Sequence, residues 1–177
     1  MLLNALLAFL IGSIPTGYLL NKYFGHGDIR KVGSGNIGAT NVFRHSGKLL
    51  GLLTLLIDIG KGFLALAGLQ YGYGFDFFSK EIFIIGSSVV LGHIFSPWLK
   101  FKGGKGVATM FGVILFLGTG YINIFLITVF SWLIIVLITR YVALGSVISL
   151  MVATIYSFFY IPSLFVFFVL MTLLITY

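Results

Sequence analysis

The sequence predicts an all-α, polytopic membrane protein with seven transmembrane helices. Of its 177 residues, 59% are hydrophobic, 8% are charged and 19 are Phe. These proportions lie outside the range of soluble globular domains and are typical of chains that cross a membrane several times. Because apolar runs recur along the whole chain, we expect residues 1–177 to form a single integral membrane domain.

Each predicted span corresponds to an apolar run, although some runs are short against the roughly 20 residues needed to cross the hydrocarbon. The first run lacks a basic start and an A-x-A-like cleavage site, so it is interpreted as a retained helix and not a signal peptide. A tight turn at 118–120 separates the fourth and fifth runs, and six spans remain the alternative. The runs lie near 2–20, 49–69, 82–97, 106–119, 121–139, 142–160 and 163–177.

Basic residues alternate between the predicted loops. With seven spans, the even loops hold only Lys80, whereas the odd loops hold Lys22, Arg30, Lys31, Arg44, Lys48, Lys100, Lys102, Lys105 and Arg140. The positive-inside rule therefore places the odd loops and the C-terminus in the cytoplasm and the N-terminus outside. A short cytoplasmic loop also explains the basic charge better than a nucleic-acid surface does, so no nucleic-acid partner is expected.

Two glycine-rich polar stretches, GSGNIGATN at 33–41 and KFKGGKG at 100–106, fall in odd loops and hence on one predicted face. Each stretch is predicted to offer bare backbone N–H groups beside a cation, as a bound anion requires. Residues 33–38 fit G-x-G-x-x-G, but no strand precedes them, and Ala39 stands where a Walker A lysine belongs. An anion-binding turn remains, with a flexible re-entrant loop as the alternative.

The second stretch follows Pro97, which is expected to end the third helix. Gly103 and Gly104 let the backbone approach a ligand closely, and Lys105 lies at the N-terminus of the fourth helix, where an anion is stabilised. Lys105 is therefore predicted to contact a ligand, whereas the lysines at 100 and 102 are interpreted as membrane anchors. His93 is open to three roles: base, hydrogen-bond donor to substrate, or helix-end residue bonded to carbonyls.

Polar residues inside the predicted spans have two interpretations each. Asp58 and Lys61 lie one turn apart, so we expect an ion pair that braces the bundle, with a proton relay as the alternative. Ser146 and Ser149 either bond their own helix or line the site from a third direction. The chain has no Cys, and its His, Asp and Glu are not spaced as metal ligands, so neither a metal nor a cofactor is predicted.

The GSGNIGATN run with Arg44 three residues further on, and GHIFSPWLKFKGGKGVAT at 92–109, resemble the motifs of the bacterial acyl-phosphate-dependent glycerol-3-phosphate acyltransferases, the PlsY family. The likeness runs nearly end to end and includes the LIDIGKGF run around Asp58. It implies transfer of a fatty acyl group from acyl phosphate to the sn-1 hydroxyl of glycerol 3-phosphate, giving lysophosphatidic acid and phosphate. Glycerol 3-phosphate, acyl phosphate and membrane lipid are the implied partners, and the bacterial inner membrane is the implied location.

Together with the two glycine-rich stretches, the resemblance gives a set of site residues. The expected catalytic residues are Ser34, Arg44, His93 and Lys105. The expected substrate-binding residues are Gly33, Gly35, Asn36, Gly38, Thr40, Asn41, Gly103, Gly104, Gly106, Thr109 and Ser146. Family members continue past the seventh helix into a cytoplasmic tail with His, Arg, Asn and Glu, so we expect this C-terminal tail, and part of the site, to be missing from the chain.

One other class of function fits a membrane protein with an anion site. A transporter of a phosphorylated small metabolite also needs several helices and a pocket for phosphate. Such a protein is expected to show inverted repeats and broken helices at the membrane midplane. The sequence shows no internal repeat, and its polar motifs lie on one face, which favours the acyltransferase. Oligomeric state is left open.

Overall fold

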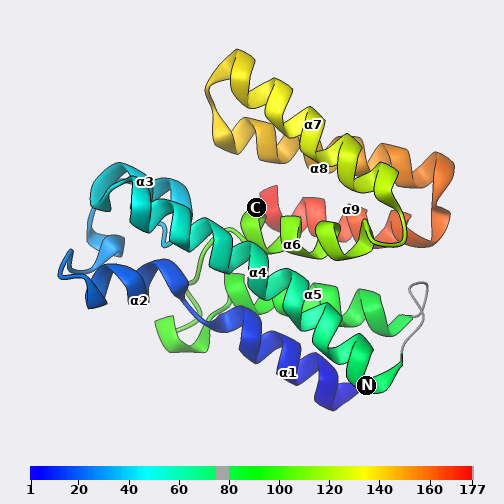
Figure 1. Ribbon diagram of the computed structural model, residues 1–177, viewed down its shortest axis with the longest axis horizontal. Coiled ribbons are helices and arrows are strands. Elements are labelled where there is room, and N and C mark those ends of the chain that lie inside the picture. Colours follow the sequence, from blue (N-terminus) through cyan, green and yellow to red (C-terminus); the bar gives the residue numbers. More distant parts are fainter. Residues whose placement is uncertain (75–79, 177) are drawn as a thin grey trace.

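The computed structural model of the chain describes residues 1–74 and 80–176, and all regular secondary structure in those ranges is helical (Figure 1). The last residue of the predicted run 163–177 and residues 75–79 of the second loop lie outside the described residues. The helices are α1 (Leu2–Ser13), α2 (Thr16–Tyr23), η1 (Ile29–Lys31), α3 (Ala39–Ser46), α4 (Lys48–Tyr73), α5 (Lys80–Ile94), η2 (Pro97–Leu99), α6 (Val107–Leu117), α7 (Ile122–Thr139), α8 (Val142–Tyr160) and α9 (Pro162–Thr176).

Within residues 1–74 and 80–176, five helical segments are long and apolar enough to cross a membrane: Leu2–Tyr23, Lys48–Tyr73, Lys80–Leu99, Ile122–Thr139 and Val142–Tyr160. Two shorter apolar helices, α6 and α9, add to them. The predicted turn between the fourth and fifth runs is confirmed, since α6 ends at Leu117 and α7 begins at Ile122. The described part of the chain thus has the all-helical fold of a multi-pass membrane protein.

The first predicted span is not one continuous helix. The run 2–20 is broken between α1 and α2, because Pro15 has no N–H to donate and the preceding Ile14 has an extended backbone, with ψ of 115°. The prediction of a single helix over this run is therefore wrong in detail. The structure also contains a short helix that was not predicted from the sequence: α3 lies inside the first polar loop.

Glycines set the close contacts between helices. On α1, a Cβ at Gly12 would lie 2.0 Å from the carbonyl oxygen of Val89 on α5. A Cβ at Gly62 of α4 would lie 2.1 Å from the carbonyl oxygen of Thr109 on α6, and Gly112 makes the reciprocal contact with Ile59. Small residues let helix backbones approach in this way inside membranes. These contacts fix α5 against α1 and α6 against α4.

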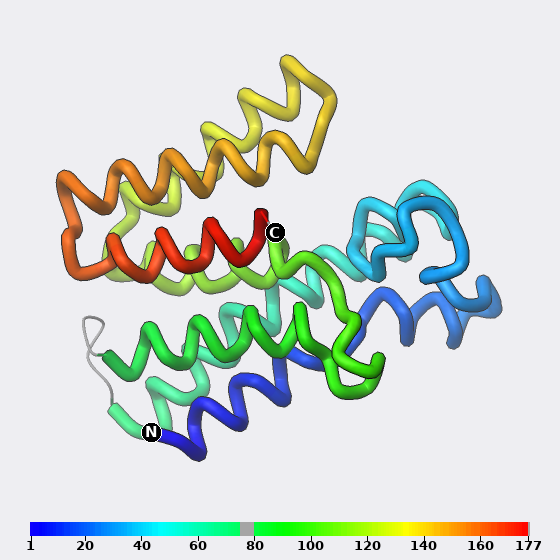
Figure 2. Tube along the Cα trace, turned by 180° about the vertical axis from the view of Figure 1, so that it is seen from behind, coloured from blue at the N-terminus to red at the C-terminus, as the bar shows by residue number. Residues whose placement is uncertain are grey.

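The helices form a bundle with two distinct ends. Figure 1 places α2, α3 and the loop after α5 at one end, and the N-terminus at the other. The view from behind in Figure 2 shows the same separation, with the α7–α8 hairpin running along one side of the bundle beside α9. The main apolar core lies between these ends and is formed by α4, α5, α6 and α9 with parts of α1, α7 and α8. Both glycine-rich stretches therefore lie at one end, as predicted.

Candidate functional site

Asn41 organises the first glycine-rich stretch. Its side-chain amide donates to the carbonyl oxygens of Ile29, Val32 and Asn36 at 3.2, 3.1 and 2.9 Å. Its Oδ1 accepts from the N–H of Ser34 at 3.2 Å. The residue is buried on α3. Its amide therefore holds the loop in shape, and a direct contact between Asn41 and substrate stays a prediction.

Several N–H groups of this loop already have acceptors. Besides Ser34, the N–H of Gly35 donates to the carbonyl oxygen of Val32 at 3.0 Å, and that of Gly38 donates to Oδ1 of Asn36 at 2.8 Å. The prediction that this stretch offers bare N–H groups is wrong for these residues. Gly33 and Gly35 are needed for a different reason, because their φ angles of 59° and 71° lie in the left-handed region.

The loop packs tightly on its neighbours. A Cβ at Gly33 would lie 2.2 Å from Nε2 of His45, so this histidine, which the sequence left without a role, lies against the start of the loop. A Cβ at Gly17 of α2 would lie 2.0 Å from the carbonyl oxygen of Ile37. The alternative of a flexible re-entrant loop does not fit such close packing. The first stretch is a fixed turn that leads into α3.

The α3 helix is amphipathic. Asn41 and Val42 are buried, whereas Thr40 and Arg44 are exposed. Residues four apart lie on the same helix face, so Thr40 and Arg44 face solvent together. Ser34 is also exposed, and Asn36 is half-buried. The first stretch and α3 therefore together present hydroxyl, amide and guanidinium groups on a rigid support.

The second glycine-rich stretch caps the end of α5. The last carbonyls of a helix lack partners within the helix. Here the N–H of Gly103 donates to the carbonyl oxygen of Ile94 at 2.9 Å, and the N–H of Gly104 donates to that of His93 at 3.1 Å. These two N–H groups are not bare, contrary to the prediction. A Cβ at Gly103 would lie 2.0 Å from the carbonyl oxygen of His93, which explains why a residue with no side chain stands there.

Lys105 is exposed and directly precedes Gly106, the N-cap of α6, whose φ is 78°. The prediction that Lys105 lies at a helix N-terminus is confirmed. Thr109, in the first turn of α6, is fully buried, and its main-chain carbonyl lies against Gly62 of α4. Thr109 thus lies below the loop, and its predicted contact with substrate stays a prediction.

Asp58 and Lys61 form the predicted ion pair, with Lys61 Nζ 2.9 Å from Asp58 Oδ1. Both side chains are buried. Lys61 Nζ also donates to the carbonyl oxygen of Ile14 at 3.1 Å, and His93 Nδ1 lies 3.8 Å from the same Asp58 oxygen. The bracing role expected of the pair is supported, because the pair joins α4 to the break between α1 and α2.

A second cross-link at this break was not predicted from the sequence. Ser96 Oγ donates to the carbonyl oxygen of Ser13 at 2.6 Å, and Trp98 Nε1 donates to Ser13 Oγ at 2.9 Å. The only signal in the sequence is the position of Ser13 just before Pro15, where a helix is expected to end and to leave carbonyls without partners.

A small apolar cluster lies beneath both glycine-rich stretches. It contains Leu99 from the second loop together with Ile37 and Val42 from the first loop and α3, and Ile29 and Leu50 complete it. All five side chains are buried. The two motifs, about 60 residues apart in the chain, therefore pack on the same apolar cluster, which we call the apolar floor.

Ser146 is buried near the start of α8. Its Oγ donates to the carbonyl oxygen of Val142 at 2.8 Å and accepts from Trp132 Nε1 at 3.3 Å. These contacts match the interpretation of a serine bonded to its own helix. Within residues 1–74 and 80–176, no hydrogen bond joins Ser146 to either glycine-rich stretch. Its predicted role as a third side of the site stays a prediction.

The end of the bundle that carries both loops is electropositive. Arg30 pairs with Asp28 at 2.7 Å and lies over the Tyr18 ring at 4.8 Å. The Arg30 hydrogen bond lowers the pKa of Asp28 from 3.8 to about 2. Arg44 and Lys105, in contrast, have no carboxylate within ion-pair distance in the described part of the chain. These two exposed cations are available to an anion.

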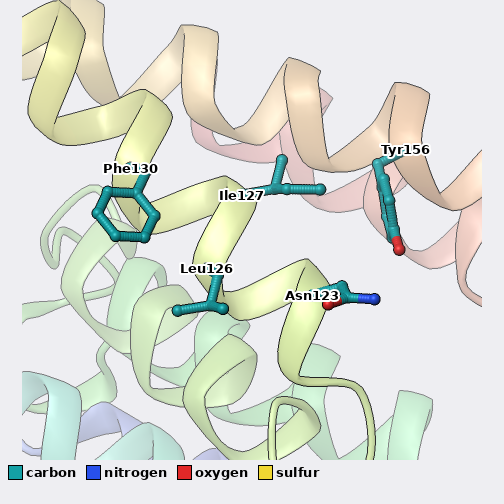
Figure 3. A pocket seen from close by; sticks show the side chains of 5 residues that line it. All are labelled: Asn123, Leu126, Ile127, Phe130 and Tyr156. Carbon is teal, nitrogen blue, oxygen red and sulfur yellow. The ribbon is translucent and has the colours of Figure 1, made fainter.

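A shallow groove lies elsewhere, along the α7–α8 hairpin. It is lined by Leu126, Ile127 and Phe130 with Asn123 and Tyr156 (Figure 3). Asn123 is in the first turn of α7, at the opposite end of that helix from Arg140. The groove is mostly apolar, as expected of a surface that faces lipid acyl chains.

Taken together, fold and site define a multi-pass membrane protein with two glycine-rich loops and exposed cations at one end of its helix bundle. A family model described as glycerol-3-phosphate acyltransferase matches residues 2–177. The chain belongs to the glycerol-3-phosphate acyltransferase family.

Individual relatives agree with this assignment. The glycerol-3-phosphate acyltransferase of Pelagibacter ubique is 44% identical over 99% of this chain and 88% of its own length. That of Carboxydothermus hydrogenoformans is 46% identical over 83% of this chain and 71% of its own length. The crystal structure of PlsY (YgiH), an integral membrane glycerol 3-phosphate acyltransferase, in its glycerol 3-phosphate form matches with a TM-score of 0.90 and 36% identity, over 99% of this chain and 86% of that one. Its lysophosphatidic acid form matches with a TM-score of 0.86.

Proposed function

We propose that the protein transfers a fatty acyl group from acyl phosphate to the sn-1 hydroxyl of glycerol 3-phosphate, giving lysophosphatidic acid and inorganic phosphate. One observation carries the proposal. Two glycine-rich loops share an apolar floor and present Arg44 and Lys105, two cations without a described carboxylate partner, at the same end of the bundle. Two cations suit two substrates that each carry a phosphate.

The proposed topology has seven spans, with the N-terminus outside and both glycine-rich loops in the cytoplasm at a bacterial inner membrane. Basic residues gather at the end of the bundle that carries the loops, which supports this orientation. The two short helices α6 and α9 count as spans in this scheme, since turns at alternate ends of the bundle precede and follow α6.

Acyl phosphate is preferred over an acyl thioester of coenzyme A as the proposed donor. Thioester-using glycerolipid acyltransferases carry an H-x₄-D signature, and none of the three histidines here has an aspartate five residues on. The loops are also short, which leaves little surface for an adenine nucleotide. Acyl phosphate is already activated, so the protein mainly has to bind and orient two substrates.

In the proposed reaction the glycerol hydroxyl oxygen attacks the acyl carbonyl carbon directly. A new ester C–O bond forms, the C–O bond to phosphate breaks, and inorganic phosphate leaves. Arg44 and Lys105 neutralise phosphate charge, and the region of Ser34 and Asn36 donates hydrogen bonds to the transition state. The glycines at 33, 35, 38, 103, 104 and 106, with Asn41, give the loops the shape that this binding needs.

The hydroxyl proton is proposed to pass to a phosphate oxygen of a substrate. Carboxylates are the usual alternative, but Asp28 is paired with Arg30, and Asp58 is buried against Lys61. His93 is also buried, and its ring faces Gly104 from below the loop. Asp58 and His93 therefore do not lie on the exposed side of the loops, where the substrates are expected, and Asp28 is already paired.

The donor experiment tests the proposal most directly. Purified protein is incubated with glycerol 3-phosphate and either palmitoyl phosphate or palmitoyl-coenzyme A at equal concentration, and lysophosphatidic acid is measured. We expect product from the phosphate only, and competitive inhibition by inorganic phosphate. Equal or faster product formation from the thioester would refute the donor assignment.

A Lys105→Ala variant tests the site. It is expected to lose about ten- to a hundredfold in kcat/KM, because a hydrogen bond to a charged group contributes roughly 1.5–3 kcal/mol. Normal turnover by a folded Lys105→Ala protein would exclude Lys105 from phosphate binding.

A further inference from the structure

The buried charges on α4 lie next to the second glycine-rich loop, and the reaction proposed above does not use them. The residues involved come from three separate parts of the chain: Asp58 and Lys61 of α4, His93 of α5, and the main chain of Ile14 at the break between α1 and α2. Insertion scales make a charge within a membrane span costly, so such residues usually serve a function.

Lys61 fixes the break. The carbonyl oxygen of Ile14 accepts from the N–H of Thr16 at 3.0 Å and also from Lys61 Nζ at 3.1 Å. The main chain at this break cannot follow helical geometry because Pro15 interrupts it. A cation that reaches the carbonyl from α4 therefore sets where the break lies relative to α4.

Asp58 extends the link to α5. Its Oδ1 lies 2.9 Å from Lys61 Nζ and 3.8 Å from His93 Nδ1. The carboxylate thus lies between a lysine and a histidine that are both buried. The Nδ1 edge of the imidazole ring thus packs against α4 without a hydrogen bond.

The other ring nitrogen of His93 reaches the glycine loop. A Cβ on Gly104 would lie 2.2 Å from Nε2 and 3.0 and 3.1 Å from the adjoining ring carbons Cδ2 and Cε1. The N–H of Gly104 donates to the carbonyl oxygen of the same histidine at 3.1 Å. Any shift of His93 therefore moves the main chain directly before Lys105.

We propose that Asp58 and Lys61 are positioning residues for the reaction: they hold His93, and through it the 103–106 loop and the Lys105 ammonium group, in the geometry that binds a phosphate-bearing substrate. This proposal rests on the proposed function. It differs from simple bracing of the bundle, because it requires that the pair affect substrate binding and not only the amount of folded protein.

The first test uses a double variant, Asp58→Asn with Lys61→Met, which removes both charges and so avoids an unpaired buried charge. The matched control is Thr54→Val, on the same helix one turn earlier, where a buried hydroxyl bonds only its own helix at 2.8 Å. We expect the double variant to be folded, as shown by a thermal unfolding transition. Its KM for a phosphate-bearing substrate should be about tenfold or more above the wild-type KM, as for the loss of one charged contact. Thr54→Val should keep the wild-type KM. The single variant Lys61→Arg retains a cation and donors for the Ile14 carbonyl oxygen. It should therefore keep most of the kcat/KM that the double variant loses through its higher KM.

A second readout does not depend on turnover. The chain contains no Cys, so Lys102→Cys carries a nitroxide label at a single site in the loop. The spectrum of this label should show greater mobility in the double variant than in the control. If the wild-type protein forms no product, the proposed function fails, while label mobility still tests the positioning. A folded double variant with wild-type KM and wild-type label mobility would overturn the proposal, and so would a loss of thermal stability alone.

Discussion

Gly104→Ala tests whether the imidazole of His93 fixes the loop before Lys105. The new Cβ would stand 2.2 Å from Nε2, whereas ordinary contact begins near 3.4 Å, so the ring or the loop must retreat by about 1 Å. The ring has little room to move because it is buried against Asp58. Overpacking of this kind costs about 1–3 kcal/mol. A chain of this size loses about 2–4 °C in melting temperature per kcal/mol.

The assay is thermal unfolding in detergent, with Gly60→Ala as the matched control. Gly60 lies in α4 between the two charged residues, and a Cβ there has nothing within 4 Å. Alanine in a helix interior is more favourable than glycine by up to about 1 kcal/mol, so the control should melt at or above the wild-type temperature. The opposite signs of the two glycine-to-alanine changes separate the local clash from any general effect of the substitution.

A double-mutant cycle then identifies the clashing partner. In a His93→Ala background the ring is absent, so Gly104→Ala should destabilise the protein much less than it does in the wild type. A coupling of about 1 kcal/mol or more is expected for residues in direct contact. If Gly104→Ala melts like the wild type, or if its effect is the same in both backgrounds, the reasoning from ring to loop is refuted.

Three further predictions concern the first loop and the topology. Arg44→Ala should lower kcat/KM about ten- to a hundredfold, as expected for a lost charged hydrogen bond, while Lys100→Ala should change it little; similar activities of the two folded variants would contradict the assignment. Single cysteines at Lys22 and Lys80 should react with impermeant thiol reagents from opposite sides of the membrane, and labelling from one side would exclude the topology. Asn41→Ala should lower the melting temperature, because about 1–3 kcal/mol is lost when buried groups are left without partners; an unchanged melting temperature would show that Asn41 does not hold the loop.

The helices were largely predictable from the sequence because hydropathy reports burial in lipid directly. The predicted runs 121–139 and 142–160 agree with α7 and α8 to within one residue. The break at Pro15 was missed because an apolar run continues on both sides of it, and hydropathy alone does not register a lost hydrogen bond. The α3 helix was missed for the opposite reason, since its eight residues are too polar to stand out from a loop.

The candidate site was predictable in its residues but not in their contacts. A short run of glycines, amides and cations indicates an anion site, because such polar residues are costly near a membrane unless they bind a ligand or stabilise the fold. The sequence did not show that the N–H groups of Gly103 and Gly104 bond the end of α5, because a glycine that exposes its N–H and a glycine that packs against a neighbour look alike in a sequence. The same limit applies to Asn41, whose amide could equally have met substrate.

Because many main-chain donors of the two loops already have acceptors, the proposed function assigns substrate recognition mainly to side chains. A guanidinium such as that of Arg44 offers a planar set of donors for two phosphate oxygens, whereas the Lys105 ammonium group acts as a compact charge. Their supports also differ, since Arg44 projects from a short helix and Lys105 from a loop held by a buried histidine. Glycine in these loops thus supplies close packing, and the packing holds the two cation-bearing segments around one apolar cluster.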